Sequence, residues 1–271
     1  MHEDFVIAPG GWRHRSHVHL VRPGTTLAMD HHPAVPVKRY RKPGAPDSAN
    51  WITSGYWTNN SGQTITSLLT SWTVPPAPSA QATQLLYLFN GIEPADGSTI
   101  VQPVLQWGDS GTDEDHINRT GPFWTVSSWI VPAPNGHAYH TPHVRVRPGD
   151  TLVGAVTLIS QSAAGFAYKC EFQGVPGTDY FTVPVAELTW CMQTLEAYEL
   201  NSAANPPYDL YSDSEYPDTA MTVFGAIDIT TKDGAGPAGT WVPWDIVDSF
   251  GERTLIAANA STNGEVDIYY R

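Results

Sequence analysis

The sequence has few charged residues and few cysteines. Only 15% of its 271 residues are charged, and its two cysteines are Cys170 and Cys191. Without a C-x-x-C spacing they argue against a zinc ribbon or a redox dithiol, and leave open one disulfide or two buried thiols. No window approaches 18 consecutive apolar residues, so we expect no membrane span. No phosphate-binding loop, dinucleotide fingerprint, kinase motif or G-x-S-x-G is found.

A sustained helical period is also missing, whereas turn and strand signals are abundant. Glycine and proline number 23 each. Short runs that alternate apolar and polar residues recur every 10–15 residues, separated by turn sequences such as PPAP, PADG and APNG. The pattern predicts an all-β fold, a sandwich of two bent antiparallel sheets that form a cleft. Predicted strands include 67–74, 84–92, 100–108, 123–131, 151–159, 167–174, 188–200, 219–229, 254–261 and 265–271.

Positive charge is concentrated at the beginning of the chain. Residues 1–45 hold seven Lys or Arg and three Asp or Glu, which leaves seven and 24 for the remainder. We therefore expect a basic, His- and Pro-rich arm with a linker over 1–50 and a sandwich domain over 51–271. Within the arm, 18–29 is predicted to form a strand pair around Pro23-Gly24. The arm either docks on the acidic body, of its own chain or of a second copy, or is a solvated tail; docking on a second copy would give a homo-oligomer.

Charge and the sequence of the first residues bear on partners and location. The acidic body repels nucleic acid and anionic membrane surfaces, so neither is an expected partner. The first residues lack a positive segment followed by an apolar run, so no signal peptide is expected. The protein is then cytoplasmic, or it is secreted and its signal has been removed.

Three carboxylates are candidate acids or bases, and two of them, Glu171 and Glu196, interrupt apolar strand sequence. Glu93 lies in NGIEPADG, Glu171 in KCEFQG and Glu196 in TLEAYEL. Such a carboxylate faces solvent or lines a cleft, and in a cleft its raised pKa suits a general acid. Aromatic residues that punctuate the strands form the core or, on a concave face, bind a ligand. The aromatic candidates for the ligand are Trp72, Trp107, Trp129 and Tyr139.

Histidines are candidates for a metal site. HAYHTPH and HRSHVHL each contain three. Residues three apart on a strand point to opposite faces, and only His17 and His19 share a face at close spacing. Two histidines need a third ligand from elsewhere in the chain. We therefore expect no metal and no other cofactor, and keep a His-ligated metal enzyme as a third alternative.

The order of several segments resembles the glutamic peptidases, the eqolisin family of acid endopeptidases. SLLTSWTVPPAP, YLFNGIEP, VLQWG, FWTVSSWIVP, TLEAYEL and EVDIYY match the family's TVP strand, WVGIDG, LQ-x-G, EWYP, AEWIVED and last strand, over roughly 51–271. The resemblance implies a sandwich of two antiparallel sheets without a metal. It also implies a glutamate that acts as base and acid, and a glutamine whose amide stabilises the oxyanion.

The resemblance assigns roles residue by residue and departs from the family at one position. Gln106 takes the place of the catalytic glutamine, Glu93 that of the Asp of GIDG, and Glu196 that of the first Glu of AEWIVED. The family's catalytic glutamate is placed before the Trp of EWYP, where this chain has Ser128 before Trp129. A serine hydroxyl is no base near acidic pH.

Two functions of different classes are left open. The first is a diverged member that lacks standard glutamic protease activity and binds an extended glycan or peptide, or a small molecule, in the cleft. In it Trp107, Trp129 and Tyr139 would stack on the ligand. The second is a hydrolase or lyase in which Glu93, Glu171 or Glu196 acts with Gln106 on a peptide or glycosidic bond.

Overall fold

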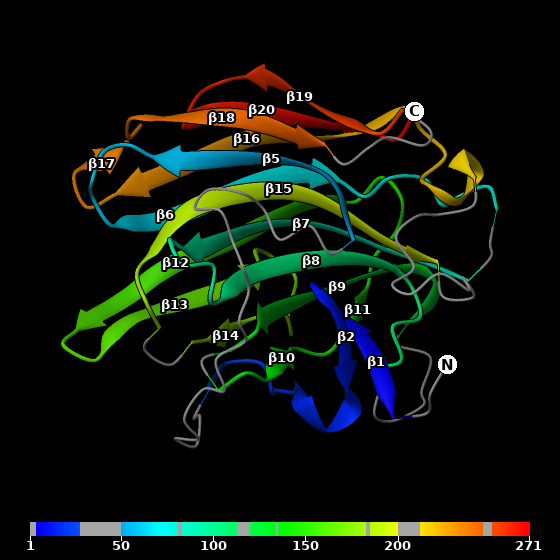
Figure 1. Cartoon of the computed structure of the whole chain (residues 1–271), viewed down its shortest axis with the longest axis horizontal. Helices are drawn as coiled ribbons and strands as arrows, with labels where there is room; N and C mark the ends of the chain where they lie inside the picture. Colours follow the sequence, from blue (N-terminus) through cyan, green and yellow to red (C-terminus); the bar gives the residue numbers. More distant parts are fainter. Residues whose placement is uncertain are drawn as a thin grey trace.

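Two large β-sheets packed face to face make up the structure, as predicted (Figure 1). This computed structural model describes residues 4–27, 50–80, 83–112, 120–133, 135–182, 185–199, 212–245 and 251–271. It contains no α-helix among these residues, and only two short 3₁₀ helices, η1 (Arg15–His17) and η2 (Asp213–Glu215). The predicted linker, KRYRKPGAPDSA at 38–49, lies outside the described residues. The division of the chain at residue 50 stays a prediction.

The front sheet of Figure 1 has nine strands. Their order is β18 (Gly239–Asp245), β5 (Trp51–Asn59), β15 (Leu188–Glu199), β7 (Gln84–Pro94), β8 (Ile100–Gly108), β9 (Gly121–Val131), β10 (Ala138–His140) and β3 (Val18–Leu20), and β11 (Val144–Arg145) also pairs with β9.

The back sheet also has nine strands, and it ends on a strand of the arm. Its order is β19 (Arg253–Ala258), β20 (Thr262–Tyr269), β16 (Met221–Thr231), β6 (Ile65–Thr73), β12 (Thr151–Ser162), β13 (Gly165–Phe172), β14 (Tyr180–Phe181) and β4 (Thr25–Thr26), and β17 (Gly234–Ala235) also pairs with β16.

The arm differs from the expected strand pair around Pro23-Gly24. β3 and β4 do not pair with each other: β3 joins β10 of the front sheet, and β4 joins β14 of the back sheet. Both pairings are parallel, so the sheets are antiparallel except at these edges. The chain before β3 forms a separate two-stranded hairpin of β1 (Phe5–Ala8) and β2 (Gly11–His14). Pro9-Gly10 makes its two-residue turn, and Gly10 has a φ of 85°.

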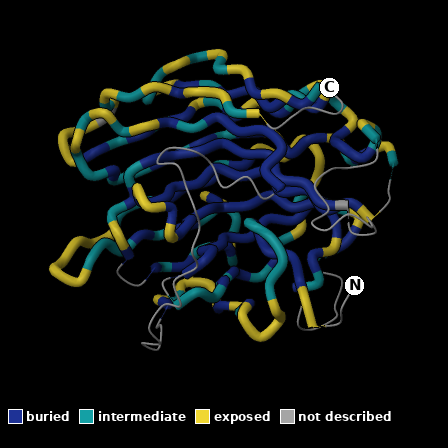
Figure 2. Tube along the Cα trace, viewed as in Figure 1, coloured by how far each residue is buried: buried dark blue, intermediate teal, exposed yellow. Residues whose placement is uncertain are grey.

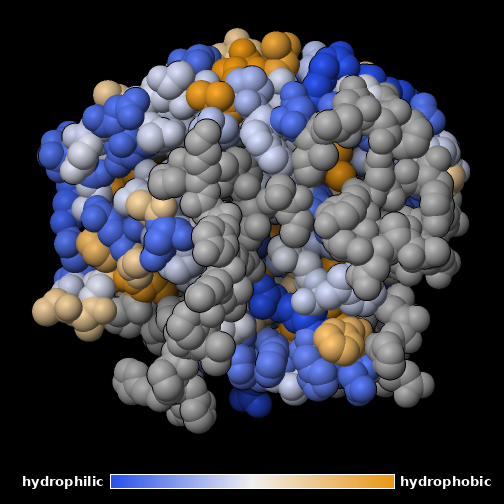
Figure 3. Space-filling model, in the orientation of Figure 1, coloured by the Kyte–Doolittle hydropathy of each residue, from blue (hydrophilic) through white to orange (hydrophobic). Residues whose placement is uncertain are grey.

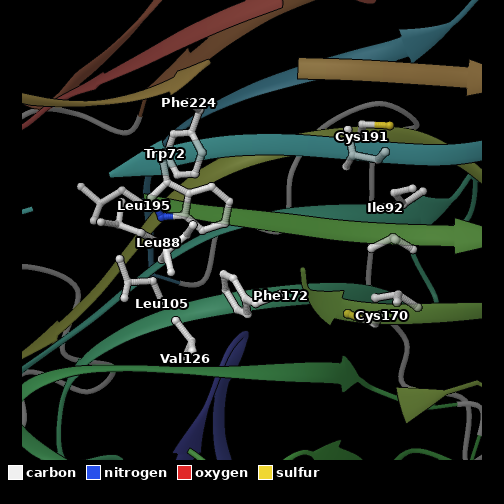
Figure 4. Close-up of a cluster of buried hydrophobic side chains, with 14 of the residues drawn as sticks. Trp72, Leu88, Ile92, Leu105, Val126, Cys170, Phe172, Cys191, Leu195 and Phe224 are labelled. Carbon is white, nitrogen blue, oxygen red and sulfur yellow. The ribbon is translucent and has the colours of Figure 1, made fainter. Parts of the chain in front are cut away.

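The main hydrophobic core fills the space between the sheets (Figure 4). Alternation along each strand builds it, because residues two apart point to the same face. On β7, Leu86, Leu88 and Ile92 point into this core. Cys170 and Cys191, on opposite sheets, are both buried there as free thiols, so of the two alternatives the disulfide is not formed.

The central front strands are buried on their other face as well. β7, β8 and the second half of β9 are dark blue along their length in Figure 2, and every residue of β7 and β8 is buried. A second apolar cluster lies on this outer face, with Leu85, Tyr87 and Phe89 from β7 and Val6 and Ile7 from the hairpin. The front sheet is therefore the middle of three layers. In the described part of the chain, no helix has the length and hydropathy to cross a bilayer.

Candidate functional site

A row of polar side chains crosses four strands on the outer face of the front sheet. Glu196 of β15 lies opposite Tyr87 of β7, Tyr87 opposite Gln106 of β8, and Gln106 opposite Thr125 of β9. All four are fully or almost fully buried. Neighbouring strands lie about 4.8 Å apart, so the Glu196 and Gln106 backbones are about 10 Å apart. Tyr87 lies between them on the same face.

Glu196 is held by hydrogen bonds from two elements. The Tyr198 hydroxyl, two residues along the same face of β15, donates to Glu196 Oε1. The backbone N–H of Gly10, at the tip of the hairpin, donates to the same oxygen at 2.8 Å. Burial is the largest cause of the raised pKa of Tyr198, and the charge of Glu196 is the second. The nearby Arg13 lowers this pKa and offsets part of the rise. Burial and Glu196 likewise raise the pKa of Tyr87. Both tyrosines thus stay protonated as donors.

Gln106 is held by the loop that follows its own strand. Its Nε2 donates to Gly108 O at 2.9 Å and to Ser110 Oγ at 3.2 Å. Ser110 Oγ is in turn 2.8 Å from Thr112 Oγ1, which lies 3.2 Å from His143 Nε2. The two amide donors of Gln106 are therefore engaged by residues 108–112, and a ligand carbonyl must displace one of these partners.

The β1–β2 hairpin covers this row. In Figure 1 it lies in front of β8 and β9, and hydrophilic side chains gather at the lower edge of the same view (Figure 3). Val6, Ile7 and Ala8 are buried against the outer face. The Tyr87 hydroxyl donates to Ile7 O at 2.9 Å, and Ile7 N donates to Ser110 O at 3.0 Å. An extended strand thus occupies the face on which the Glu196–Gln106 pair lies.

Of the predicted carboxylates, only Glu196 lies in the row. Glu93 is buried on the same face of β7 opposite Trp190. It is six residues from Tyr87, about 20 Å along a strand. Glu171 lies on β13 of the back sheet, partly exposed, and pairs with Lys169 at 2.7 Å. Ser128 occupies an inward position on β9, next to the Cys170 thiol; burial raises the pKa of this thiol, and the Ser128 hydroxyl partly offsets the rise.

The predicted aromatic residues divide between the two faces. Trp107 and Trp72 lie in the core between the sheets, Trp107 against Trp124 with ring centroids 5.3 Å apart. Trp129 lies on the outer face but is fully buried, and it stacks on His140 at 4.4 Å. Tyr139 is half-buried near the arm. None of the three tryptophans has a face open to a ligand.

The histidines of the arm meet those of the β9–β10 connection. His137 stacks on His17 at 4.7 Å and on His19 at 4.9 Å between ring centroids. His19 Nε2 lies 2.7 Å from His137 Nδ1. Across the described ranges, no group of three or more His, Cys, Asp or Glu is arranged to hold a metal ion.

Tyr87, Thr125 and Tyr198 belong to the site but were not among the candidates. Alternation was the signal that would have found two of them, because Tyr198 follows Glu196 by two residues and Tyr87 interrupts the apolar run of β7 with a hydroxyl. Thr125 carries no signal of its own. Its place in the row depends on the register of β8 with β9.

Comparisons with known proteins bear on the fold. No family model matches the sequence, and no curated protein matches it. Among solved structures, scytalido-glutamic peptidase with a peptide-based transition state analog aligns with a TM-score of 0.50 at 14% identity, over 82% of this chain and 98% of that one. SCP-B, a member of the eqolisin family of peptidases in a complex with the tripeptide Ala-Ile-His, aligns at 15% identity and a TM-score of 0.48, over 82% and 98%. The chain thus has a β-sandwich fold similar to that of scytalido-glutamic peptidase.

Proposed function

We propose that this protein is a hydrolase that cleaves an extended peptide, with Glu196 as general base and acid and Gln106 as the oxyanion donor. The observation that carries the proposal is the cross-strand row that aligns the two residues on one face with Tyr87 between them. In the proposed reaction the carboxylate contacts the water that attacks the carbonyl carbon of the peptide. The amide contacts the carbonyl oxygen from the other side.

The reaction follows from these two side chains. The Glu196 carboxylate takes a proton from a water molecule that attacks the carbonyl carbon of the peptide. The Gln106 amide donates a hydrogen bond to the oxygen as it becomes negative. The protonated Glu196 then gives its proton to the departing nitrogen, and the carboxylate is restored. Ser128 has no part in these steps, because its inward position on β9 lies on the other face of the sheet.

The test is cleavage of an unfolded protein between pH 3 and pH 7, read by mass spectrometry of the products. Glu196→Gln should lower the rate by about 10²- to 10⁴-fold, the usual contribution of a positioned acid or base. Gln106→Ala should lower it by about 10²- to 10³-fold, as for an oxyanion donor. Glu265→Gln, on β20 of the back sheet, is the matched control and should stay within twofold. Undiminished cleavage by Glu196→Gln would refute the assignment.

A second candidate is peptide binding without hydrolysis, which the docked strand β1 favours. β1 lies on the face with its main chain bonded to the Tyr87 hydroxyl and to Ser110 O. Glycan binding draws no such support, because Trp72 and Trp107 are enclosed between the sheets. Retention of a labelled extended peptide at acidic pH, with no cleavage and equal retention by Glu196→Gln, would select this second candidate.

A further inference from the structure

We propose that the β1–β2 hairpin is a built-in, removable occupant of the Glu196–Gln106 site, and that a stack of histidines beside it releases it when the pH falls. The proposal concerns regulation of the site and rests on the proposed function for its consequence. Release of the hairpin is itself a physical event, measurable whatever chemistry follows.

The hairpin occupies both halves of the site. At one end Gly10 N donates to Glu196 Oε1 at 2.8 Å, so the carboxylate is engaged by a main-chain donor. At the other end Ile7 N donates to Ser110 O at 3.0 Å, which holds the loop that engages Gln106. A peptide substrate could bind neither residue while the hairpin is in place. Its departure frees the carboxylate and unties the 108–112 loop together.

The hairpin is built to separate from the body. β1 pairs with β2 alone and joins neither large sheet. Isolated two-stranded hairpins are marginal in water, so this one depends on its contact with the face. Val6, Ile7 and Ala8 of β1 are buried, whereas Phe5 is 40% exposed and the residues of β2 are half-buried or exposed. The strands that follow, β3 and β4, stay paired in the sheets and tether the hairpin.

The histidine stack lies where the chain leaves the hairpin. His17 ends η1, directly after β2, and His19 lies in β3. Both rings stack on His137, at 4.7 and 4.9 Å, and His14 of β2 lies 5.9 Å from His17. The stack therefore joins the exit of the hairpin to the β9–β10 connection, and it fixes the direction in which the hairpin leaves β3.

Protonation opposes this arrangement in two ways. The 2.7 Å contact between His19 Nε2 and His137 Nδ1 requires that one nitrogen donate and the other accept. Imidazolium has two donors and no acceptor, so the contact is lost when both rings are charged. Stacked positive rings also repel one another, and histidine is the side chain whose charge changes between pH 7.5 and 5. His14 and Tyr139 lie against the stack, and Arg15, which precedes His17 in the same 3₁₀ turn, is directed to Gly111 O.

The test is amide hydrogen exchange of the intact chain, followed for residues 4–14 at pH 7.5 and 5.0 and corrected for intrinsic rates. Residues 100–108 of β8 serve as the reference that reports global unfolding. We expect protection of the hairpin to fall at least fivefold more than that of β8 at pH 5.0. In His137→Gln, which removes the shared ring, the loss should be less than half of that. A smaller loss in the wild type, or an equal loss in the variant, overturns the proposal.

A second variant separates this proposal from the proposed function. Ile7→Asp places a charge at a position that is 1% exposed and should open the hairpin at both pH values. If the wild-type hairpin opens at pH 5.0 and neither protein cleaves an unfolded substrate, the proposed hydrolysis is wrong and the proposed pH-dependent release of the hairpin stands. If Ile7→Asp cleaves the unfolded substrate at pH 7 and the wild-type hairpin stays in place at pH 5.0, the proposed hydrolysis stands and the proposed pH-dependent release is wrong.

Discussion

Removal of one hydroxyl group, in Tyr198→Phe, tests whether the Glu196 side chain is a charged carboxylate stabilised by hydrogen bonds from the protein. Tyr198 is fully buried, and its ring packs edge-on against Tyr87 at 6.2 Å, so phenylalanine keeps the packing. The substitution deletes only the donor to Glu196 Oε1 and leaves the Gly10 amide in place. Whatever stability is lost therefore reports on one hydrogen bond to one carboxyl group.

The expected loss depends on the charge of the carboxyl group. A hydrogen bond to a charged group contributes about 1.5–3 kcal/mol, and a neutral one about 0.5–1.5 kcal/mol. If Glu196 is ionised at pH 7, as the proposed base requires, the variant should lose about 2 kcal/mol there and about 1 kcal/mol at a pH where the carboxyl is protonated. For a domain of this size, a loss of about 2 kcal/mol at pH 7 lowers the Tm by about 4–8 °C.

The assay is urea denaturation of wild type and variant at several pH values between 3 and 7. Tyr180→Phe is the matched control: its buried hydroxyl donates to a neutral acceptor, Trp129 O, at 2.7 Å. Its loss of stability should be about 1 kcal/mol and independent of pH. If Tyr198→Phe is also independent of pH, Glu196 does not ionise in the folded protein over this range, and its role as a general base would be refuted.

Two further predictions concern the core. Burial raises the pKa of Cys170 from 9.0 to about 12; because the folded state holds this proton more tightly, its contribution to stability is present below pH 9 and falls by up to about 1.4 kcal/mol per pH unit above it. Urea denaturation from pH 8 to 10.5 should show a slope that Cys170→Ala reduces by that amount. Gly239→Ala should lower the free energy of unfolding by about 1–3 kcal/mol or more, because the new Cβ lies 2.0 Å from the Trp57 ring. Gly225→Ala is the control, because its new Cβ meets no atom closer than 3.7 Å, and its Tm in thermal denaturation should equal that of the wild type.

The sequence predicted the strands well because period-two alternation and turn residues are local signals. The run 100–108 is β8 residue for residue, and 123–131 lies within β9. The arm was less predictable. Residues 18–29 carry a turn between two apolar stretches, which suggests a hairpin, but each stretch finds a better partner in β10 or β14. Pairing with a strand more than 100 residues away leaves no local trace in the sequence.

The site was predictable only in part, because membership depends on which face a residue occupies. Alternation alone would have separated Gln106 from Trp107, since adjacent residues of a strand point to opposite faces. Which of the two faces holds the core cannot be read from β7 or β8, because both faces carry large apolar residues and both are buried. The extra layer, the hairpin, conceals the usual polar signature of an outer face. Choosing Glu196 over Glu93 needs the register of β15 with β7, which fixes the residue opposite Tyr87.

Unsatisfied polar groups on the outer face of the front sheet bear on the ligand of the proposed site. Gln102, four residues before Gln106 on the same face, is fully buried, and neither its amide nitrogen nor its oxygen has a hydrogen-bond partner among the described residues. The Gln106 oxygen and the Thr125 hydroxyl are in the same situation. Buried polar groups of this kind are costly unless a partner or water reaches them. An extended peptide backbone presents donors and acceptors in alternation, and these amides and this hydroxyl can take both. The hairpin bonds Glu196, the Tyr87 hydroxyl and Ser110 O but leaves these groups without a partner. Under the proposed function, a peptide that satisfied them would replace the hairpin.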